Sequence, residues 1–132
     1  MIKKIFMTVV LLILSLISWG QDSSNKSIIF DRVIHDFGVI EKGSKAECIF
    51  TFINKSPKPV AIRGVKVTCG CTLPSWSKEP VPQGGSGKIK VKYNSNITGS
   101  FNKTITVLIT GDTEPIQLTM KGEVKKKEKK NN

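Results

Sequence analysis

Two of the three cysteines lie one residue apart, in the stretch Val67-Thr68-Cys69-Gly70-Cys71-Thr72. This stretch closes a run of alternating apolar residues and continues through Leu73 and Pro74 to Trp76. Thiols can form disulfides, exchange electrons and bind soft metals. Any chemistry of this chain is therefore expected at this stretch.

Three interpretations of Cys69 and Cys71 remain open. The first is structural: a disulfide between them, or from one of them to Cys48, which requires Cα atoms within about 7 Å. The second is redox, because strained disulfides are the more oxidising ones, although no histidine or helix N-terminus is evident to lower a thiol pKa. The third is a Cu(I) or partial zinc site, with His35 as the only imidazole. Structural or inert thiols are favoured over the other two.

Leu73 and Trp76 are candidate residues for contact with a partner. A tryptophan in a segment rich in proline and serine can anchor a protein partner, or it can cover the open end of a folded domain. Catalysis and a cofactor are not expected. The sequence has no paired carboxylates in a plausible cleft, no nucleophile–histidine–acid set and no phosphate loop before a helix.

The first twenty residues have the pattern of a secretory signal peptide. Lys3 and Lys4 precede an apolar stretch at 5–17, and Ser18-Trp19-Gly20 places small residues before a cleavage site at Gln21. The apolar stretch is shorter than the roughly 20 residues of a spanning helix. We expect an exported protein of the periplasm, the cell surface or the medium, without a stable membrane span after cleavage; an uncleaved anchor is the alternative.

The chain is basic, with a formal net charge of +11 from 21 lysines and arginines against 10 acidic residues. Export argues against nucleic acid and favours another envelope protein or an anionic envelope surface as the partner. Arg32 and Arg63 are the only arginines, and charge carried mainly by lysine favours diffuse solvation. The densest charge runs from Lys125 to Lys130, within a predicted disordered tail at 125–132 that either contacts anionic surfaces or aids solubility.

Between a flexible leader at 21–27 and this tail, apolar residues alternate with polar ones. Six or seven short strands separated by turn residues predict one all-β domain at 28–124, an antiparallel β-sandwich. The phase of the alternation slips at Arg63-Gly64, which predicts a β-bulge. The segment 73–87 is expected to be a long loop. The predicted strands are 28–30, 33–39, 46–53, 60–67, 88–93, 101–110 and 116–121.

Several short motifs occur in a characteristic order along the domain. They are His35-Asp36-Phe37-Gly38-Val39-Ile40, Phe50-Thr51-Phe52-Ile53-Asn54-Lys55, Cys69-Gly70-Cys71-Thr72, Pro82-Gln83-Gly84-Gly85-Ser86-Gly87-Lys88-Ile89, Gly99-Ser100-Phe101-Asn102-Lys103 and Leu118-Thr119-Met120-Lys121-Gly122-Glu123-Val124. With these motifs the chain resembles the bacterial envelope domains catalogued as domain of unknown function 1573, common in Bacteroidetes. The resemblance implies export and an immunoglobulin-like sandwich of about seven strands, and brings no established activity. Cys48 is a departure from the family's pattern.

Overall fold

The computed structural model describes residues 1–14 and 26–129. Helix α1 covers Ile2–Leu14, within the predicted signal peptide. The predicted cleavage site and most of the predicted leader lie outside the described residues, as does Lys130 in the tail. In the described part of the chain, no helix is both long and apolar enough to cross a membrane.

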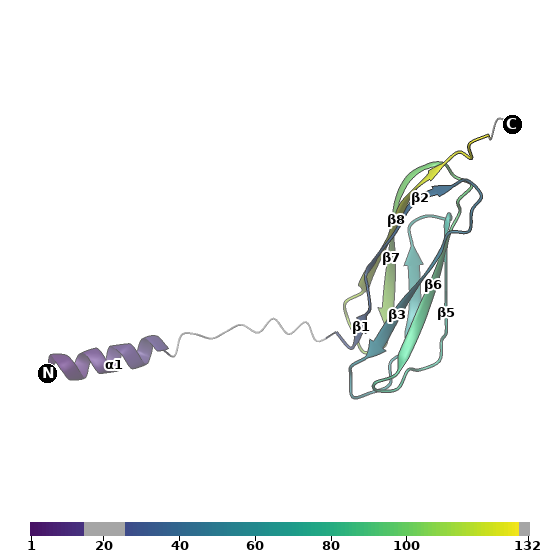
Figure 1. Ribbon diagram of the computed structural model, residues 1–132. Helices are drawn as coiled ribbons and strands as arrows, with labels where there is room; N and C mark the ends of the chain where they lie inside the picture. The colour runs from purple at the N-terminus through teal and green to yellow at the C-terminus, as the bar shows by residue number, and fades with distance from the viewer. Residues whose placement is uncertain (15–25, 130–132) are drawn as a thin grey trace.

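Eight strands form two four-stranded sheets packed face to face (Figure 1). One sheet has the order β1-β3-β6-β5 and the other β2-β8-β7-β4, and all pairs are antiparallel except β2 with β8. The predicted β-sandwich is confirmed, with one strand more than expected. The strands are β1 (Ile28–Phe30), β2 (Ile34–Glu41), β3 (Glu47–Asn54), β4 (Ile62–Val67), β5 (Thr72–Trp76), β6 (Ser86–Tyr93), β7 (Gly99–Ile109) and β8 (Ile116–Lys125).

The core lies between the sheets because each strand presents every second side chain inward. On β3, Phe50 and Phe52 are buried, while Ile49 before them and Ile53 after them are exposed. Burying one such apolar side chain contributes about 1.5–3 kcal/mol. The apolar inner residues with no exposed surface are Phe50, Ile89, Val91, Ile105, Val107, Leu118 and Met120.

The predicted bulge in β4 is confirmed. Ile62 pairs with Ile109 and Gly64 with Leu108, so Arg63 is the extra residue in the strand. The bulge corrects the phase, and Ile62, Val65 and Val67 all pack toward the core.

The predicted loop at 73–87 is wrong in its first part, because Thr72–Trp76 is strand β5 at the edge of a sheet. The sequence does not predict this strand because Pro74 lacks the N–H that donates to the hydrogen-bond ladder of a sheet. The N–H of Asn94 donates to the C=O of Cys71 (2.8 Å), so odd-numbered residues here direct their backbone groups toward β6. The nitrogen of Pro74 therefore faces the free edge, where no donor is required.

Candidate functional site

Cys69 and Cys71 form a disulfide at the point where the chain leaves one sheet and enters the other. Strand β4 ends just before Cys69, and β5 begins just after Cys71 in the opposite sheet. Their Cα atoms are 5.2 Å apart, within the usual range for a bridge. Cys71 is buried, Cys69 half-buried and Gly70 exposed. The bridge thus closes the crossover between the two layers.

Backbone hydrogen bonds hold the crossover at both ends. The N–H of Thr72 donates to the C=O of Cys69 (3.2 Å), and the C=O of Cys71 accepts from the N–H of Asn94 (2.8 Å). The N–H of Cys71 also donates to Sγ of Cys69 (3.3 Å). While the bridge is intact, neither sulfur is a thiolate that could bind a metal or attack a substrate.

Cys48 takes no part in the bridge. It is a free cysteine on β3, only 4% exposed and facing the core. Burial raises the pKa of its thiol to about 11, and the positive charge of Arg32 opposes that shift only partly. A buried thiol with a raised pKa is unreactive at neutral pH.

Leu73 and Trp76 lie on opposite faces of β5. Trp76 packs against the core, and its indole N–H has no hydrogen-bond partner within the described part of the chain. Leu73 is 62% exposed on the outer face, beside Lys92 of β6. Of the two predicted contact residues, Leu73 is exposed and Trp76 is half-buried.

We call the outer surface of β3, β6 and β5 the lysine face, after Lys88, Lys90 and Lys92 of β6. Two rows of side chains cross it from strand to strand, because directly paired residues share a face. The rows are Glu47–Lys92–Leu73 and Ile49–Lys90–Ser75.

Glu47 is the one carboxylate in these rows. Its oxygens lie 3.2 Å from the ammonium of Lys92, 3.3 Å from that of Lys90 and 3.5 Å from that of Lys45. Desolvation alone would raise the pKa of Glu47, but hydrogen bonds from Lys92 and Lys90 and the charges of Lys45 and Lys90 together lower it. Reasoning from the sequence missed this cluster, because the register that brings Glu47 opposite Lys92 is not visible in either strand alone.

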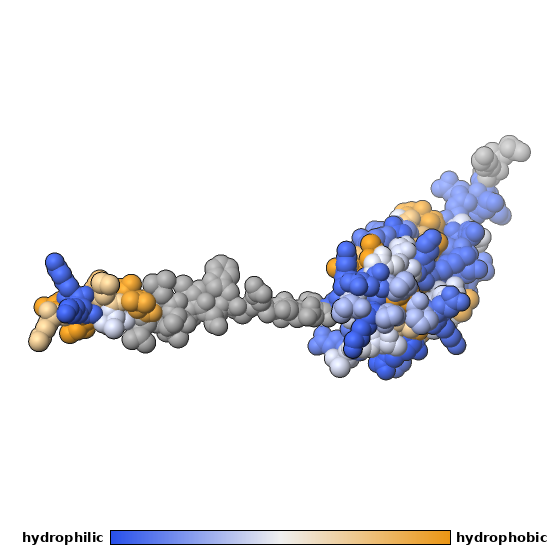
Figure 2. Space-filling model, turned by 90° about the horizontal axis from the view of Figure 1, so that it is seen from below, coloured by the Kyte–Doolittle hydropathy of each residue, from blue (hydrophilic) through white to orange (hydrophobic). Residues whose placement is uncertain are grey.

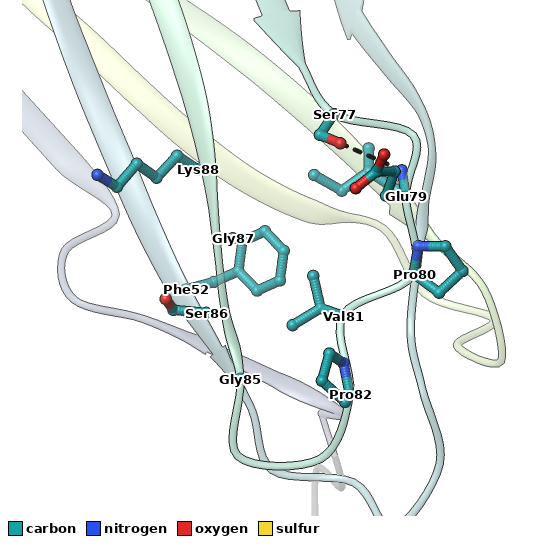
Figure 3. Close-up of a pocket in the computed structure, with 11 residues that line it drawn as sticks. Phe52, Ser77, Glu79, Pro80, Val81, Pro82, Gly85, Ser86, Gly87 and Lys88 are labelled. Atoms are coloured by element: carbon teal, nitrogen blue, oxygen red, sulfur yellow. Dashed lines mark hydrogen bonds between the residues drawn. The ribbon is translucent and has the colours of Figure 1, made fainter.

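A hollow of about 220 Å³ lies at the end of the sandwich, between β6 and the segment that precedes it (Figure 3). The ring of Phe52 lies against Gly87, and Val81 and Pro82 form the opposite side. The hydroxyl of Ser77 accepts a hydrogen bond from the N–H of Glu79 (3.2 Å), which fixes a turn. His35, the sole histidine of the sequence, does not line this hollow, so Ser77 has no imidazole base there.

In the parts of the chain that the structure describes, no three or more histidine, cysteine, aspartate or glutamate residues form a group that could hold a metal ion. A metal on Cys69 and Cys71 would therefore need the bridge to be reduced. It would also need further ligands other than the histidine, cysteine, aspartate and glutamate side chains of the described residues. Nothing in the geometry of the crossover favours it.

The two packed sheets define an immunoglobulin-like β-sandwich. The chain is similar in fold to a Porphyromonas gingivalis W83 protein of unknown function, with a TM-score of 0.65 and 13% identity over 73% of this chain and 46% of that one. A PapD-like domain of human CEP192 gives a TM-score of 0.65 and 12% identity, over 77% and 87% of the two chains. VesB, a protease of Vibrio cholerae, gives a TM-score of 0.60 and 13% identity, over 76% of this chain and 32% of that one.

Residues 28–124 match the family described as protein of unknown function (DUF1573), and the chain belongs to that family. Among curated proteins, none matches the sequence closely enough to count as a relative. The fold likenesses are too distant in sequence to transfer an activity, so function has to be argued from the surface of this domain.

Proposed function

We propose that this protein is an exported module of the bacterial cell envelope that binds another protein through the lysine face and performs no catalysis. The basic and apolar pattern of residues 1–20 supports export. The fold supports a binding role, since the domain is a β-sandwich without a catalytic set in the hollow of Figure 3. The observation that carries the proposal is the arrangement of charge and apolar surface on the lysine face.

Addition of a partner strand to a sheet edge is disfavoured, because all four edge strands are blunted in ways that hinder pairing. In one sheet, β1 has only three residues and β5 contains Pro74 at its free edge. In the other sheet, both edge strands are irregular. The ladder of β2 breaks between Asp36 and Val39, with Gly38 at φ 66°, and that of β4 breaks at Arg63. A partner is therefore expected to dock on side chains.

The lysine face offers side chains of two kinds close together. Leu73 on β5 (62% exposed) and Ile49 on β3 (43% exposed) lie on either side of the lysines of β6. Surface charge on the rest of the domain is high, and on the side seen in Figure 2 hydrophilic residues surround small separate hydrophobic patches. An apolar anchor beside several ammonium groups suits a partner with an apolar residue surrounded by carboxylates. The exposed tail lysines Lys126, Lys127 and Lys129 would add attraction to anionic surfaces.

Site-specific photo-crosslinking in intact cells tests this proposal. A photoreactive residue at position 73 is expected to give one discrete protein adduct, and one at Val39 none; Val39 is a matched control because it is also 62% exposed but lies on β2 of the other sheet. Reversing the charges of Lys90 and Lys92 should abolish the adduct. An adduct that survives the reversal, or that forms equally at Val39, contradicts the proposal. Export is checked separately by sequencing the mature N-terminus, expected at Gln21.

A thiol–disulfide role is the second candidate, favoured by the bridge at the crossover with exposed Gly70 between its cysteines. In such a reaction, a thiolate of a reduced dithiol partner attacks one sulfur of the bridge. The partner's second thiol then resolves the mixed disulfide, leaving Cys69 and Cys71 as thiols and the partner oxidised. Equilibration with glutathione buffers tests it: a bridge fully reduced or fully oxidised across the whole physiological range of potentials would rule out a redox role.

A further inference from the structure

A second cleft, lined by charged and apolar residues, opens where β1 ends and the chain crosses to β2. Its volume is about 450 Å³, and it is distinct from the hollow of Figure 3. Three basic side chains meet there from different parts of the sequence. The lining residues are Arg32, His35, Lys45, Glu47, Cys48 and Ile49.

The backbone at this cleft has an unfinished sheet edge. The ladder of β1 and β3 ends at Phe30 and Phe52. Beyond it, the N–H of Asp31 donates to the C=O of Thr51 (2.9 Å), and a carboxylate oxygen of Asp31 accepts from the N–H of Thr51 (3.2 Å). No strand continues the pairing along Ile49 and Glu47 in the described part of the domain.

Arg32 partly covers that edge. Its Nη2 donates to the C=O of Ile49 (3.1 Å), which shows that the backbone groups of Ile49 face the cleft. In an antiparallel strand, the N–H and C=O of one residue point to the same side. The N–H of Ile49 is therefore directed into the cleft as well. A guanidinium has five N–H donors in a planar fork, so Arg32 retains donors beyond this one bond.

The charges around the cleft leave the cations in excess. The carboxylate of Glu47 is already engaged by Lys90 (3.3 Å) and Lys92 (3.2 Å) on the lysine face, and the Lys45 side chain, 3.5 Å away, is 78% exposed. Asp31 accepts hydrogen bonds from the backbone of Arg32 and Thr51. Both carboxylates are thus already engaged, Glu47 by three ammonium groups and Asp31 by two backbone N–H groups, whereas the Arg32 guanidinium makes one hydrogen bond.

His35 stands at the rim of the same cleft, in edge contact with the ring of Phe37 (centroids 4.4 Å apart). Desolvation and the charge of Arg32 lower the pKa of His35, and the charge of Asp36 opposes them. The carboxylate of Asp36 accepts the N–H of Gly38 (2.8 Å). The lowered pKa favours the neutral imidazole, and a negative group in the cleft would favour the protonated form, which adds a third cationic donor to Arg32 and Lys45.

We propose that this cleft is a binding site for a single oxyanion group, a carboxylate or a phosphate, held by Arg32, Lys45, the N–H of Ile49 and a protonated His35. Arginine presents a forked pair of donors that matches either group. When the anion binds, His35 takes up a proton from solvent. Its affinity therefore rises as pH falls, and binding raises the pKa of His35.

Titration of the full-length protein with inorganic phosphate, and separately with acetate, tests the site. At constant ionic strength, the ring protons of His35 are followed by NMR across a pH series. Saturable shifts and a raised pKa of His35 are expected, and which anion saturates at lower concentration distinguishes phosphate from carboxylate. Shifts that stay linear in concentration for both anions would overturn the proposal.

Two pairs of variants locate the donors. R32Q should weaken binding about 10- to 100-fold, while R63Q, at the bulge of β4, leaves it unchanged. K45Q should weaken binding and K66Q, on the outer surface of β4, should not. H35N should weaken binding at low pH, where the protonated imidazole donates, and should remove the part of the pH dependence that His35 contributes. Equal effects of R32Q and R63Q would show general charge attraction in place of a site.

Discussion

The rings of Tyr93 and Phe101 stack face to face across the sandwich, with centroids 3.8 Å apart and planes inclined by 14°. Tyr93 ends β6 in one sheet, and Phe101 belongs to β7 in the other. Phe101 also contacts Phe37 of β2, with ring centroids 6.0 Å apart. This pair joins the two layers near the end where the chain passes from β6 to β7.

Phe101→Ala should destabilise the domain by about 3–5 kcal/mol, because it removes a buried ring and leaves a cavity between the sheets. Urea denaturation followed by tryptophan fluorescence measures the loss. Tyr93→Phe is the matched control: it keeps the stacked ring and should change the free energy of unfolding by less than about 1 kcal/mol. A loss for Phe101→Ala no larger than this would show that the stack contributes little.

Gly87→Ala should be destabilising by about 1–3 kcal/mol, since a Cβ at this position would lie 2.3 Å from Cζ of the Phe52 ring. The ring is buried, so it must shift within the packed domain to admit the added methyl group. Gly70→Ala serves as the control, because nothing lies within 4 Å of its added Cβ, and it should fall within about 0.5 kcal/mol of the wild type. Comparable losses for the two variants would mean that the Phe52 contact is unimportant.

Cys48 should make stability fall at alkaline pH. Its pKa is about 11 in the folded protein and 9.0 when unperturbed, so the unfolded chain loses the thiol proton first. The contribution is complete below about pH 9 and is lost between pH 9 and 11, by at most about 2–3 kcal/mol. The measurement is the difference between wild type and Cys48→Ala, which isolates the contribution of this thiol from that of every other group. Parallel pH profiles of the two proteins would contradict the assignment.

Removal of the crossover bridge should cost little stability. A disulfide over so short a loop removes little entropy from the unfolded chain, so Cys69→Ser with Cys71→Ser should destabilise by only about 1–2 kcal/mol. The variant is expected to fold and to keep the crosslink at position 73. If it folds normally and that crosslink disappears, the bridge has a role beyond structure.

Sequence patterns identified most of this fold, and the failures have physical causes. The slip of phase at Arg63-Gly64 was sufficient to predict a bulge, because alternation is a local property of one strand. Strand β5 was missed because Pro74 is unfavourable in strands in general and acceptable only where its nitrogen faces a free edge, which depends on the fold. The site residues divide in the same way. Cys69 and Cys71 are neighbours in sequence, whereas Arg32 and Lys45 meet only because β1 stops short and the chain changes sheets.

Strand β8 lies in the interior of its sheet, between β2 and β7, although it comes last of the described strands. Residues near position 34 therefore pair with residues near position 119 that come much later in the chain, as the pairing of Ile34 with Thr119 shows. Contacts this distant in sequence make folding slow. During synthesis, the part of the domain that precedes β8 cannot complete its second sheet. The order of the strands therefore delays closure of the core until β8 has been made.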